Sequence, residues 1–281
     1  MTGIVGIALA TFVIQTGGWI FSAFALVLSL VGWYEFSAAF SRRGTRTTFF
    51  TGILGLALLW GCAWLGNAEE FTGVSMFLLA VVLLESVLLH GHVSFDGACI
   101  SIAGIFYVGF PFAHLLLLRF FHPGEMIGTP LGDFEIGCAY VWIMFIGTWA
   151  SDTFAYFVGS LMGSHRLCPS ISPNKTVEGF LGSLIGTTAS VVALGGIFFG
   201  FPLYEMGALG FCIAILATLG DLVESVMKRH TGIKDSGNLI PGHGGVLDRF
   251  DSVLFTAPFV YYFVQVNALL GNERILRSIL G

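Results

Sequence analysis

Long runs of apolar residues, each broken by a short polar stretch, make up most of this sequence. A membrane-spanning helix needs roughly 20 apolar residues, and somewhat shorter spans occur. The first run is short, and only Gly17 and Gly18 separate it from the second, so eight spans remain an alternative to nine. The pattern predicts about nine spans, at residues 3–16, 18–40, 48–66, 72–89, 99–119, 135–161, 179–200, 203–225 and 252–271.

Composition supports the same class of protein. Hydrophobic residues make up 56% of the chain and charged residues only 10%, whereas a soluble domain carries roughly a quarter charged residues. This excludes a soluble enzyme, a disordered chain and a nucleic-acid binder. The chain shows no ten-residue alternation typical of a membrane barrel. We therefore predict an all-α, polytopic integral membrane protein with a single domain over residues 1–281.

The distribution of basic residues predicts the orientation, because cytoplasmic loops are enriched in Lys and Arg. With nine spans, three loops on one side hold nine of the 12 basic residues: Arg42, Arg43, Arg46, Arg166, Lys175, Lys228, Arg229, Lys234 and Arg249. We expect these loops and the N-terminus to be cytoplasmic, in the inner membrane if the source is bacterial. The first charge is Glu35, so a cleaved signal peptide is not expected.

Charged residues concentrate in the C-terminal third of the chain. Asp221, Glu224 and Lys228 are spaced i, i+3, i+7, so on a helix they share one face. Asp248 and Asp251 are likewise three residues apart, near the start of the last span. Two helix ends are therefore expected to present carboxylates towards one membrane surface.

Such a set suits a metal ion and phosphate groups. Mg²⁺ binds carboxylate oxygens and brings substrate phosphates with it, Lys and Arg neutralise the remaining phosphate charge, and glycines let the backbone approach a bulky anion. The residues between the two helix ends include bases, a histidine and glycines: Lys228, Arg229, Lys234, His243, Gly244 and Gly245. A solvated loop whose charges serve only topology is the alternative.

Further polar residues lie in the preceding spans and loops. Ser172, Lys175 and Glu178 are expected to extend the phosphate pocket from the same side, and Asp152 has either a functional or a structural polar role. Glu35 and Glu85, near the ends of their spans, are expected at the interface or in hydrogen bonds to a neighbouring helix. The stretch His90-Gly91-His92 is expected to be incidental rather than a metal site.

Residues 225–251 also carry a dense motif. Its fixed positions are Ser225, Lys228-Arg229, Lys234-Asp235, Gly237, Ile240-Pro241, His243-Gly244-Gly245, Asp248-Arg249 and Asp251. This motif resembles the signature of phosphatidate cytidylyltransferases, also called CDP-diacylglycerol synthases. Ser151-Asp152-Thr153 and the stretch from Ser172 to Gly179 also look like that family. The first half of the chain matches it only in hydropathy.

The resemblance implies a reaction in which the cytidylyl group of CTP passes to phosphatidic acid, giving CDP-diacylglycerol and pyrophosphate. It implies a need for Mg²⁺, with more than one ion, and a homodimer. Residues 148–251 would hold the active site. The expected metal ligands are Asp221, Asp248 and Asp251, with Asp152 as a weaker fourth. The expected catalytic residues are the three aspartates Asp221, Asp248 and Asp251 together with Lys228, Arg229, Lys234, His243 and Arg249, whose positive charge or hydrogen bonds would act on the phosphates. The expected substrate-binding residues are Ser172, Lys175, Glu178, Asp235, Gly244 and Gly245.

Two other functions remain as alternatives. The first is a related membrane transferase or kinase that acts on a different lipid. The second is a secondary transporter, which would also contain intramembrane carboxylates and glycine-rich helices but would place its binding site near the bilayer midplane. The predicted clustering of charge at one membrane face favours an enzyme that works at the surface.

Overall fold

The computed structural model describes residues 2–237 and 244–280 and is predominantly helical. The α-helices are α1 (Thr2–Thr16), α2 (Gly18–Ser41), α3 (Phe49–Trp64), α4 (Phe71–Leu88), α5 (Phe95–Gly104), α6 (Phe110–Arg119), α7 (Ile136–Met162), α8 (Val177–Val191), α9 (Leu203–Thr231) and α10 (Leu247–Leu280). A 3₁₀ turn, η1 (Ala68–Glu70), precedes α4, and two π-helical segments, η2 (Ile105–Gly109) and η3 (Val192–Phe198), follow α5 and α8. The prediction of an all-α polytopic membrane protein is confirmed.

Each predicted apolar run corresponds to a helical segment. Among the described residues, seven helical segments are long and apolar enough to cross a membrane: Gly18–Ser41, Ala68–Leu88, Phe95–Arg119, Ile136–Met162, Val177–Phe198, Leu203–Thr231 and Leu247–Leu270. Two shorter apolar helices, Gly6–Thr16 and Phe49–Trp64, account for the remaining two runs. The 15 residues of α1 extend about 22 Å, less than the roughly 30 Å hydrocarbon core.

The two helices richest in charge extend beyond their predicted limits. Helix α9 continues past residue 225 to Thr231, and α10 begins at Leu247 rather than at residue 252. The predicted limits are wrong because they follow the apolar runs, which stop at the first charged residues. A helix can continue through such residues, since Glu, Lys, Arg and Met are good helix formers. Gly232, at φ 73°, ends α9 in the left-handed conformation typical of a helix C-terminus. The predicted metal ligands Asp221, Asp248 and Asp251 therefore lie on helices.

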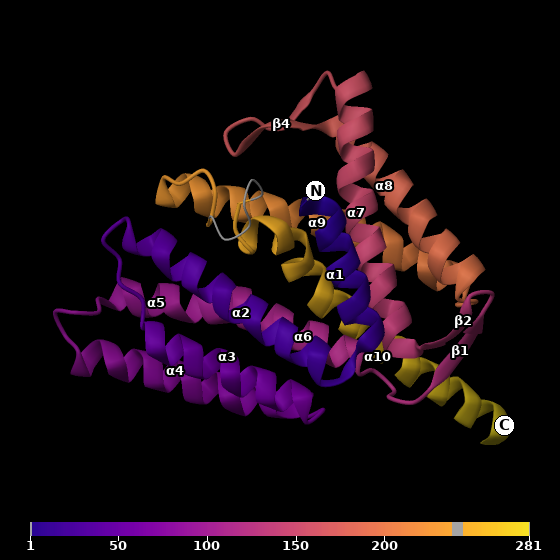
Figure 1. The fold of residues 1–281 in the computed structure, drawn as a ribbon, viewed down its shortest axis with the longest axis horizontal. Helices are drawn as coiled ribbons and strands as arrows, with labels where there is room; N and C mark the ends of the chain where they lie inside the picture. The colour runs from indigo at the N-terminus through magenta and orange to yellow at the C-terminus, as the bar shows by residue number, and fades with distance from the viewer. Residues whose placement is uncertain (1, 238–243, 281) are drawn as a thin grey trace.

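Two short antiparallel hairpins lie at opposite ends of α7, where the sequence pattern predicted only loops (Figure 1). One pairs β1 (Met126–Thr129) with β2 (Gly132–Glu135), and the other pairs β3 (Arg166–Cys168) with β4 (Ser172–Thr176). Each strand has at most five residues, too few for an alternating pattern to show. The β3–β4 hairpin is the one that carries Ser172 and Lys175.

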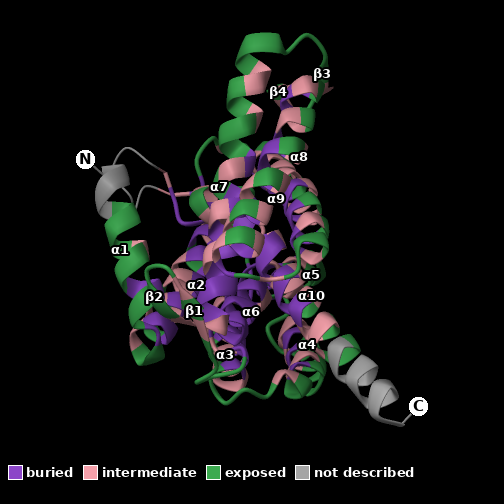
Figure 2. Cartoon of the chain, turned by 90° about the vertical axis from the view of Figure 1, so that its right-hand side faces the viewer, coloured by how far each residue is buried: buried purple, intermediate pink, exposed green. Residues whose placement is uncertain are grey.

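The core lies where α10 packs against α6, α7 and α9. Figure 2 shows the buried residues concentrated in the middle of the molecule, while much of the outer ends of α7 and α8 is exposed. The described exposed surface contains many large apolar side chains, among them Tyr156, Leu161 and Ile185, as expected where lipid takes the place of water. Glycines let the helices approach closely: a Cβ on Gly220 of α9 would lie 2.5 Å from the backbone oxygen of Asp251 on α10.

Candidate active site

The C-terminal half of α9 and the first turns of α10 meet through a group of charged side chains. Glu224 and Lys228, one turn apart on α9, form an ion pair. Lys228 Nζ also donates to Asp248 Oδ1 of α10 at 3.0 Å. The Glu224 side chain is 1% exposed and that of Lys228 is 21% exposed. The lysine thus bridges two carboxylates and joins the helices that carry them.

Asp248 is held by protein groups on both of its oxygens. Oδ1 accepts from Lys228, and Oδ2 accepts from the backbone N–H groups of Ser236 and Gly245, each at 2.8 Å. Through the bond from Gly245, the Asp248 side chain reaches back to the backbone just before α10, and a negative charge in the first turn of a helix is favourable. Asp248 therefore connects the end of α9, the segment that follows α9 and the start of α10.

Ser236 adds a second link within the same group. Its hydroxyl donates to Glu224 Oε1 at 3.0 Å and lies 3.4 Å from Asp248 Oδ1. We name Glu224, Lys228, Ser236 and Asp248 the clamp, since together they join α9 to α10. Ser236 occupies a variable position of the motif, so the motif did not indicate a role for it.

A second group of carboxylates lies beside the clamp. Lys175 Nζ of β4 pairs with Asp221 Oδ2 at 2.6 Å, and Ser225 donates to the other Asp221 oxygen at 3.3 Å. Asp152 of α7 and Asp251 of α10 are close enough to Asp221, and to each other, for their charges to interact. We name Asp152, Asp221, Asp251 and Lys175 the acidic group, because three carboxylates lie around the ion pair of Lys175 with Asp221.

The β3–β4 hairpin positions Lys175 against α9. Arg229 Nε donates to the backbone oxygen of Ile171 in the hairpin turn at 3.3 Å. At the other end of β4, Thr176 caps α8 by accepting the N–H of Gly179 at 3.1 Å. Glu178 accepts from His165 Nδ1 at 2.6 Å and from the N–H of Ser164 at 3.1 Å. Glu178 thus closes the hairpin at its base rather than joining the acidic group.

The remaining predicted site residues have varied surroundings. Lys234 and Asp235 are exposed in the segment that follows α9, and Ser172 is half-buried at the start of β4. Arg249 is exposed on the first turn of α10. Gly244 has φ 78°, a conformation that favours glycine, and Gly245 is buried. His243 lies outside the described residues.

Two side chains from the first half of the chain also reach this region. Glu35 of α2 is hydrogen-bonded to the start of α10, which confirms one of the two alternatives predicted for it. The Tyr107 hydroxyl is buried without a hydrogen-bond partner among the described residues and is close enough to Glu224 and Asp251 to interact with their charges. Tyr107 lies in an apolar run and was not predicted as a site residue. Its hydroxyl is the one feature of the residue that could have suggested a place in the site.

The acidic group has the donor chemistry for a hard cation. Mg²⁺ binds one or two protein carboxylates and completes its octahedron with waters and substrate phosphates. The described residues contain no three acidic, histidine or cysteine side chains close enough to hold an ion on their own. A cation here would therefore share its coordination between Asp152, Asp221 or Asp251 and a phosphate-bearing substrate. Both Asp248 oxygens already accept from the clamp and the backbone.

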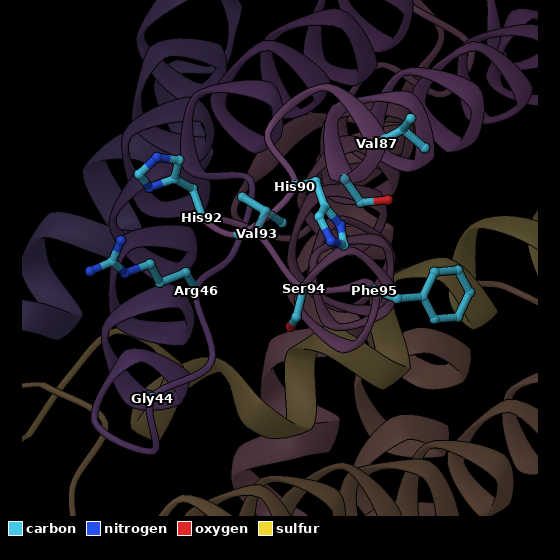
Figure 3. Close-up of a pocket in the computed structure, with 10 residues that line it drawn as sticks. Gly44, Arg46, Val87, His90, His92, Val93, Ser94 and Phe95 are labelled. Atoms are coloured by element: carbon cyan, nitrogen blue, oxygen red, sulfur yellow. The ribbon is translucent and has the colours of Figure 1, made fainter.

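A separate cavity lies at the loops that join α2 to α3 and α4 to α5 (Figure 3). It has a volume of about 760 Å³, and Arg46, His90, His92 and Ser94 are among its lining residues. Its lining includes none of the clamp or the acidic group. Among the described residues at this cavity, no three histidine, cysteine or acidic side chains are close enough to hold a metal ion.

The chain is similar in sequence to known proteins. Residues 1–267 match the cytidylyltransferase family. Over 278 residues the chain is 30% identical to the phosphatidate cytidylyltransferase of Bacillus subtilis (strain 168), covering 95% of this chain and 96% of that protein. Over 288 residues it is 35% identical to the phosphatidate cytidylyltransferase of Synechocystis sp., covering 94% of each. The chain therefore belongs to the cytidylyltransferase family.

Proposed function

We propose that this protein is a phosphatidate cytidylyltransferase, which transfers the cytidylyl group of CTP to phosphatidic acid and releases pyrophosphate. The observation that carries this proposal is the acidic group beside the clamp, built from α7, the β3–β4 hairpin, α9 and α10. The identity of the substrates is inferred from the names of the relatives. The arrangement of charged side chains supports it. Both substrates bear phosphates, which need cations and hydrogen-bond donors.

The position of the site favours surface chemistry over transport. Asp221, Glu224 and Lys228 lie in the last 11 residues of α9, and Asp248 and Asp251 lie in the first five of α10. The charges thus gather at the ends of two helices, whereas a transporter site is expected near the midplane. A cleft at this level would let the acyl chains of phosphatidic acid stay in lipid while its headgroup meets CTP from the aqueous phase.

In the proposed reaction, a phosphate oxygen of phosphatidic acid attacks the α-phosphorus of CTP. The new P–O bond forms as the bond to the β-phosphate oxygen breaks, and pyrophosphate leaves with that electron pair. The attacking oxygen is already anionic, so the chain needs to supply little general-base catalysis. Its residues act by positioning and by charge neutralisation, as in phosphoryl transfer generally.

Individual residues take the following roles in this proposal. The ion pair of Lys175 with Asp221 is partly broken when CTP binds, and Lys175 then neutralises a CTP phosphate. Further positive charge at the site comes from Arg229, Lys234 and Arg249.

The nucleotide is bound between the two helix ends. The residues that contact it are Ser172, Asp235, Gly244 and Gly245, and His243 donates to the leaving pyrophosphate. Lys228 and Asp248 keep α9 and α10 in register, so that Asp221 and Asp251 face the same phosphates.

We also propose that the reaction needs Mg²⁺, with more than one ion as an expectation. Asp152, Asp221 and Asp251 would hold it, and when bound it would neutralise phosphate charge on the attacking and leaving oxygens. The three like charges support this assignment, because such a group is unfavourable without compensating cations. Lys175 and Lys228 are both near enough to interact with these carboxylates, but Lys228 already pairs with Glu224 and Asp248, so a further cation is favourable.

The resemblance to the family further supports a homodimer in the cell membrane, with the active-site loops cytoplasmic. Light scattering of the protein in detergent micelles of known mass tests the dimer. A mass of one chain would contradict it.

Pyrophosphate release from the purified protein in mixed micelles tests the function. Phosphatidic acid is supplied with each nucleoside triphosphate in turn, in the presence of Mg²⁺ or EDTA. We expect release only when CTP, phosphatidic acid and Mg²⁺ are present together. Release that persists in EDTA would contradict the metal proposal, whereas release with another lipid in place of phosphatidic acid would indicate a related transferase.

A further inference from the structure

We propose that Glu35 of α2 is a positioning residue for this active site, which holds the start of α10 and thereby places Asp248 and Asp251. The inference rests on the proposed function for what the site does, but the contact itself does not depend on it. Glu35 lies more than 180 residues upstream of the motif. It lies in the first half of the chain, which contains none of the motif residues.

The Glu35 carboxylate caps the first turn of α10. Its side chain is buried, at 3% exposure. Oε1 accepts the backbone N–H of Val246 and Oε2 that of Leu247, each at 3.0 Å. The first N–H groups of a helix have no partner within it, and a carboxylate there also interacts favourably with the helix dipole. Both oxygens of one side chain thus fix two consecutive peptide groups.

Two motif glycines leave room for this carboxylate. A Cβ on Gly245 would lie 2.6 Å from both Glu35 oxygens, and a Cβ on Gly237 would also clash with the carboxylate. Neither glycine has a positive φ, so backbone conformation does not require glycine at these positions. The space that Glu35 occupies accounts for both residues.

The energetics favour a specific role over simple packing. A buried carboxylate is costly unless hydrogen bonds compensate for its lost hydration. A hydrophobic residue would fill the same volume without that cost but would leave two buried N–H groups unpaired. Glutamine would present one oxygen and one NH₂ group to two donors, so it would satisfy only one of them.

The cap acts on the site through the geometry of α10. Asp248 follows Leu247 directly, and Asp251 lies one turn further along the helix. If the N–H groups of Val246 and Leu247 are released, the first turn of α10 is free to fray or rotate. Asp248 would then leave the clamp, and Asp251 would lose its register with Asp221.

The substitution Glu35→Gln tests the proposal, with Glu85→Gln as a matched control. Glu85 lies within α4 and accepts a hydrogen bond from Thr51 of α3, outside the clamp and the acidic group. Loss of one charge-assisted hydrogen bond predicts a kcat about tenfold to a hundredfold lower for Glu35→Gln. The Mg²⁺ concentration for half-maximal activity should rise as well, while Glu85→Gln stays within about twofold of the wild type on both measures. Wild-type kcat and Mg²⁺ dependence in folded Glu35→Gln protein would overturn the proposal.

A second variant covers the case in which Glu35→Gln does not fold. Gly237→Ala keeps Glu35, but the added Cβ would clash with the Glu35 carboxylate and displace it. We expect this substitution to lower kcat at least tenfold as well. A folded Gly237→Ala protein with wild-type kcat would overturn the proposal.

Hydrogen exchange separates this proposal from the proposed function. We expect Glu35→Gln to increase exchange in a peptide covering residues 244–255, but not in one covering α7. If the wild-type protein makes no CDP-lipid, the proposed function fails, yet this local change would still support the cap. Unchanged exchange, or an equal increase in both peptides, would overturn it.

Discussion

Asp248 and Asp251 lie nearly one turn apart on α10, yet their side chains have different surroundings. Asp248 accepts hydrogen bonds from Lys228, Ser236 and Gly245, whereas the Asp251 carboxylate accepts from the N–H of its neighbour Ser252 at 2.6 Å. The first carboxylate is thus committed to the protein, and the second is the better placed to bind a metal or substrate. The motif names both residues but does not distinguish these roles.

This difference predicts different effects of the same substitution. We expect Asp248→Asn and Asp251→Asn to abolish turnover, but only Asp248→Asn to lower stability, by about 1–3 kcal/mol, because its amide group would face donors. Thermal unfolding of both variants in detergent checks this. Equal unfolding temperatures for the two variants would contradict the assignment of Asp248 to the clamp.

Lys175 offers a test of phosphate binding. Its ion pair with Asp221 is partly exposed, with side-chain exposures of 23% and 32%, and such pairs contribute only about 0–1 kcal/mol to stability. Lys175→Ala should therefore leave the unfolding temperature nearly unchanged but raise the KM for CTP about tenfold, as expected for a lost phosphate contact. Arg43→Ala, in the α2–α3 loop, serves as the control. A wild-type KM for Lys175→Ala would exclude this role.

At the level of elements, the close approach of α9 and α10 sets the width of the site. A Cβ on Gly220 would meet the Asp251 backbone, whereas one on Gly207 of the same helix would find its nearest neighbour, Val192 Cγ2, at 3.9 Å. Backbone cannot move aside as a flexible side chain can. Gly220 is therefore needed for helix contact, while Gly207 is not.

We accordingly expect Gly220→Ala to lower activity at least tenfold and to destabilise the protein, by about 1–3 kcal/mol, as overpacking does. Gly207→Ala should be neutral or slightly stabilising, since alanine favours a helix over glycine by up to about 1 kcal/mol. Activity and thermal unfolding of the pair check both expectations. Similar behaviour of the two variants would contradict the close packing of α9 on α10.

The apolar runs predicted where the helical segments lie, but not every boundary. Apolar runs locate helices because lipid requires both an apolar surface and internally satisfied backbone groups. The same reasoning fails at the end of α9 and the start of α10, where charged residues continue the helix along a protein-lined face. The β3–β4 hairpin, which positions Lys175, is too short to leave a periodic pattern.

At the scale of the whole molecule, the site brings together residues that are far apart in the chain. The spacing of Glu224 and Lys228 predicted their shared face, and the motif brought in Asp248. The contribution of Glu35 could not be predicted, because nothing local links it to the backbone of Val246 and Leu247. Contacts of this kind depend on the tertiary packing of α2 against α10.

The orientation of the molecule can be tested at the two hairpins, which lie at opposite ends of α7 (Figure 1). In a variant without the five native cysteines, we expect Gly128→Cys in the β1–β2 hairpin to react with a membrane-impermeant maleimide on intact cells. Ser170→Cys in the β3–β4 turn should react only after the cells are opened, because the basic loops face the cytoplasm. The reverse pattern would contradict the predicted orientation.

The most direct test of the account is the formation of CDP-diacylglycerol from CTP and phosphatidic acid by three purified proteins: the wild type, Asp251→Asn and Glu85→Gln. Mass spectrometry of the extracted lipid identifies the product, and thermal unfolding verifies that each protein is folded. We expect CDP-diacylglycerol from the wild type and from Glu85→Gln, and none above background from Asp251→Asn. Product formation by folded Asp251→Asn, or its absence with the wild type, would contradict it.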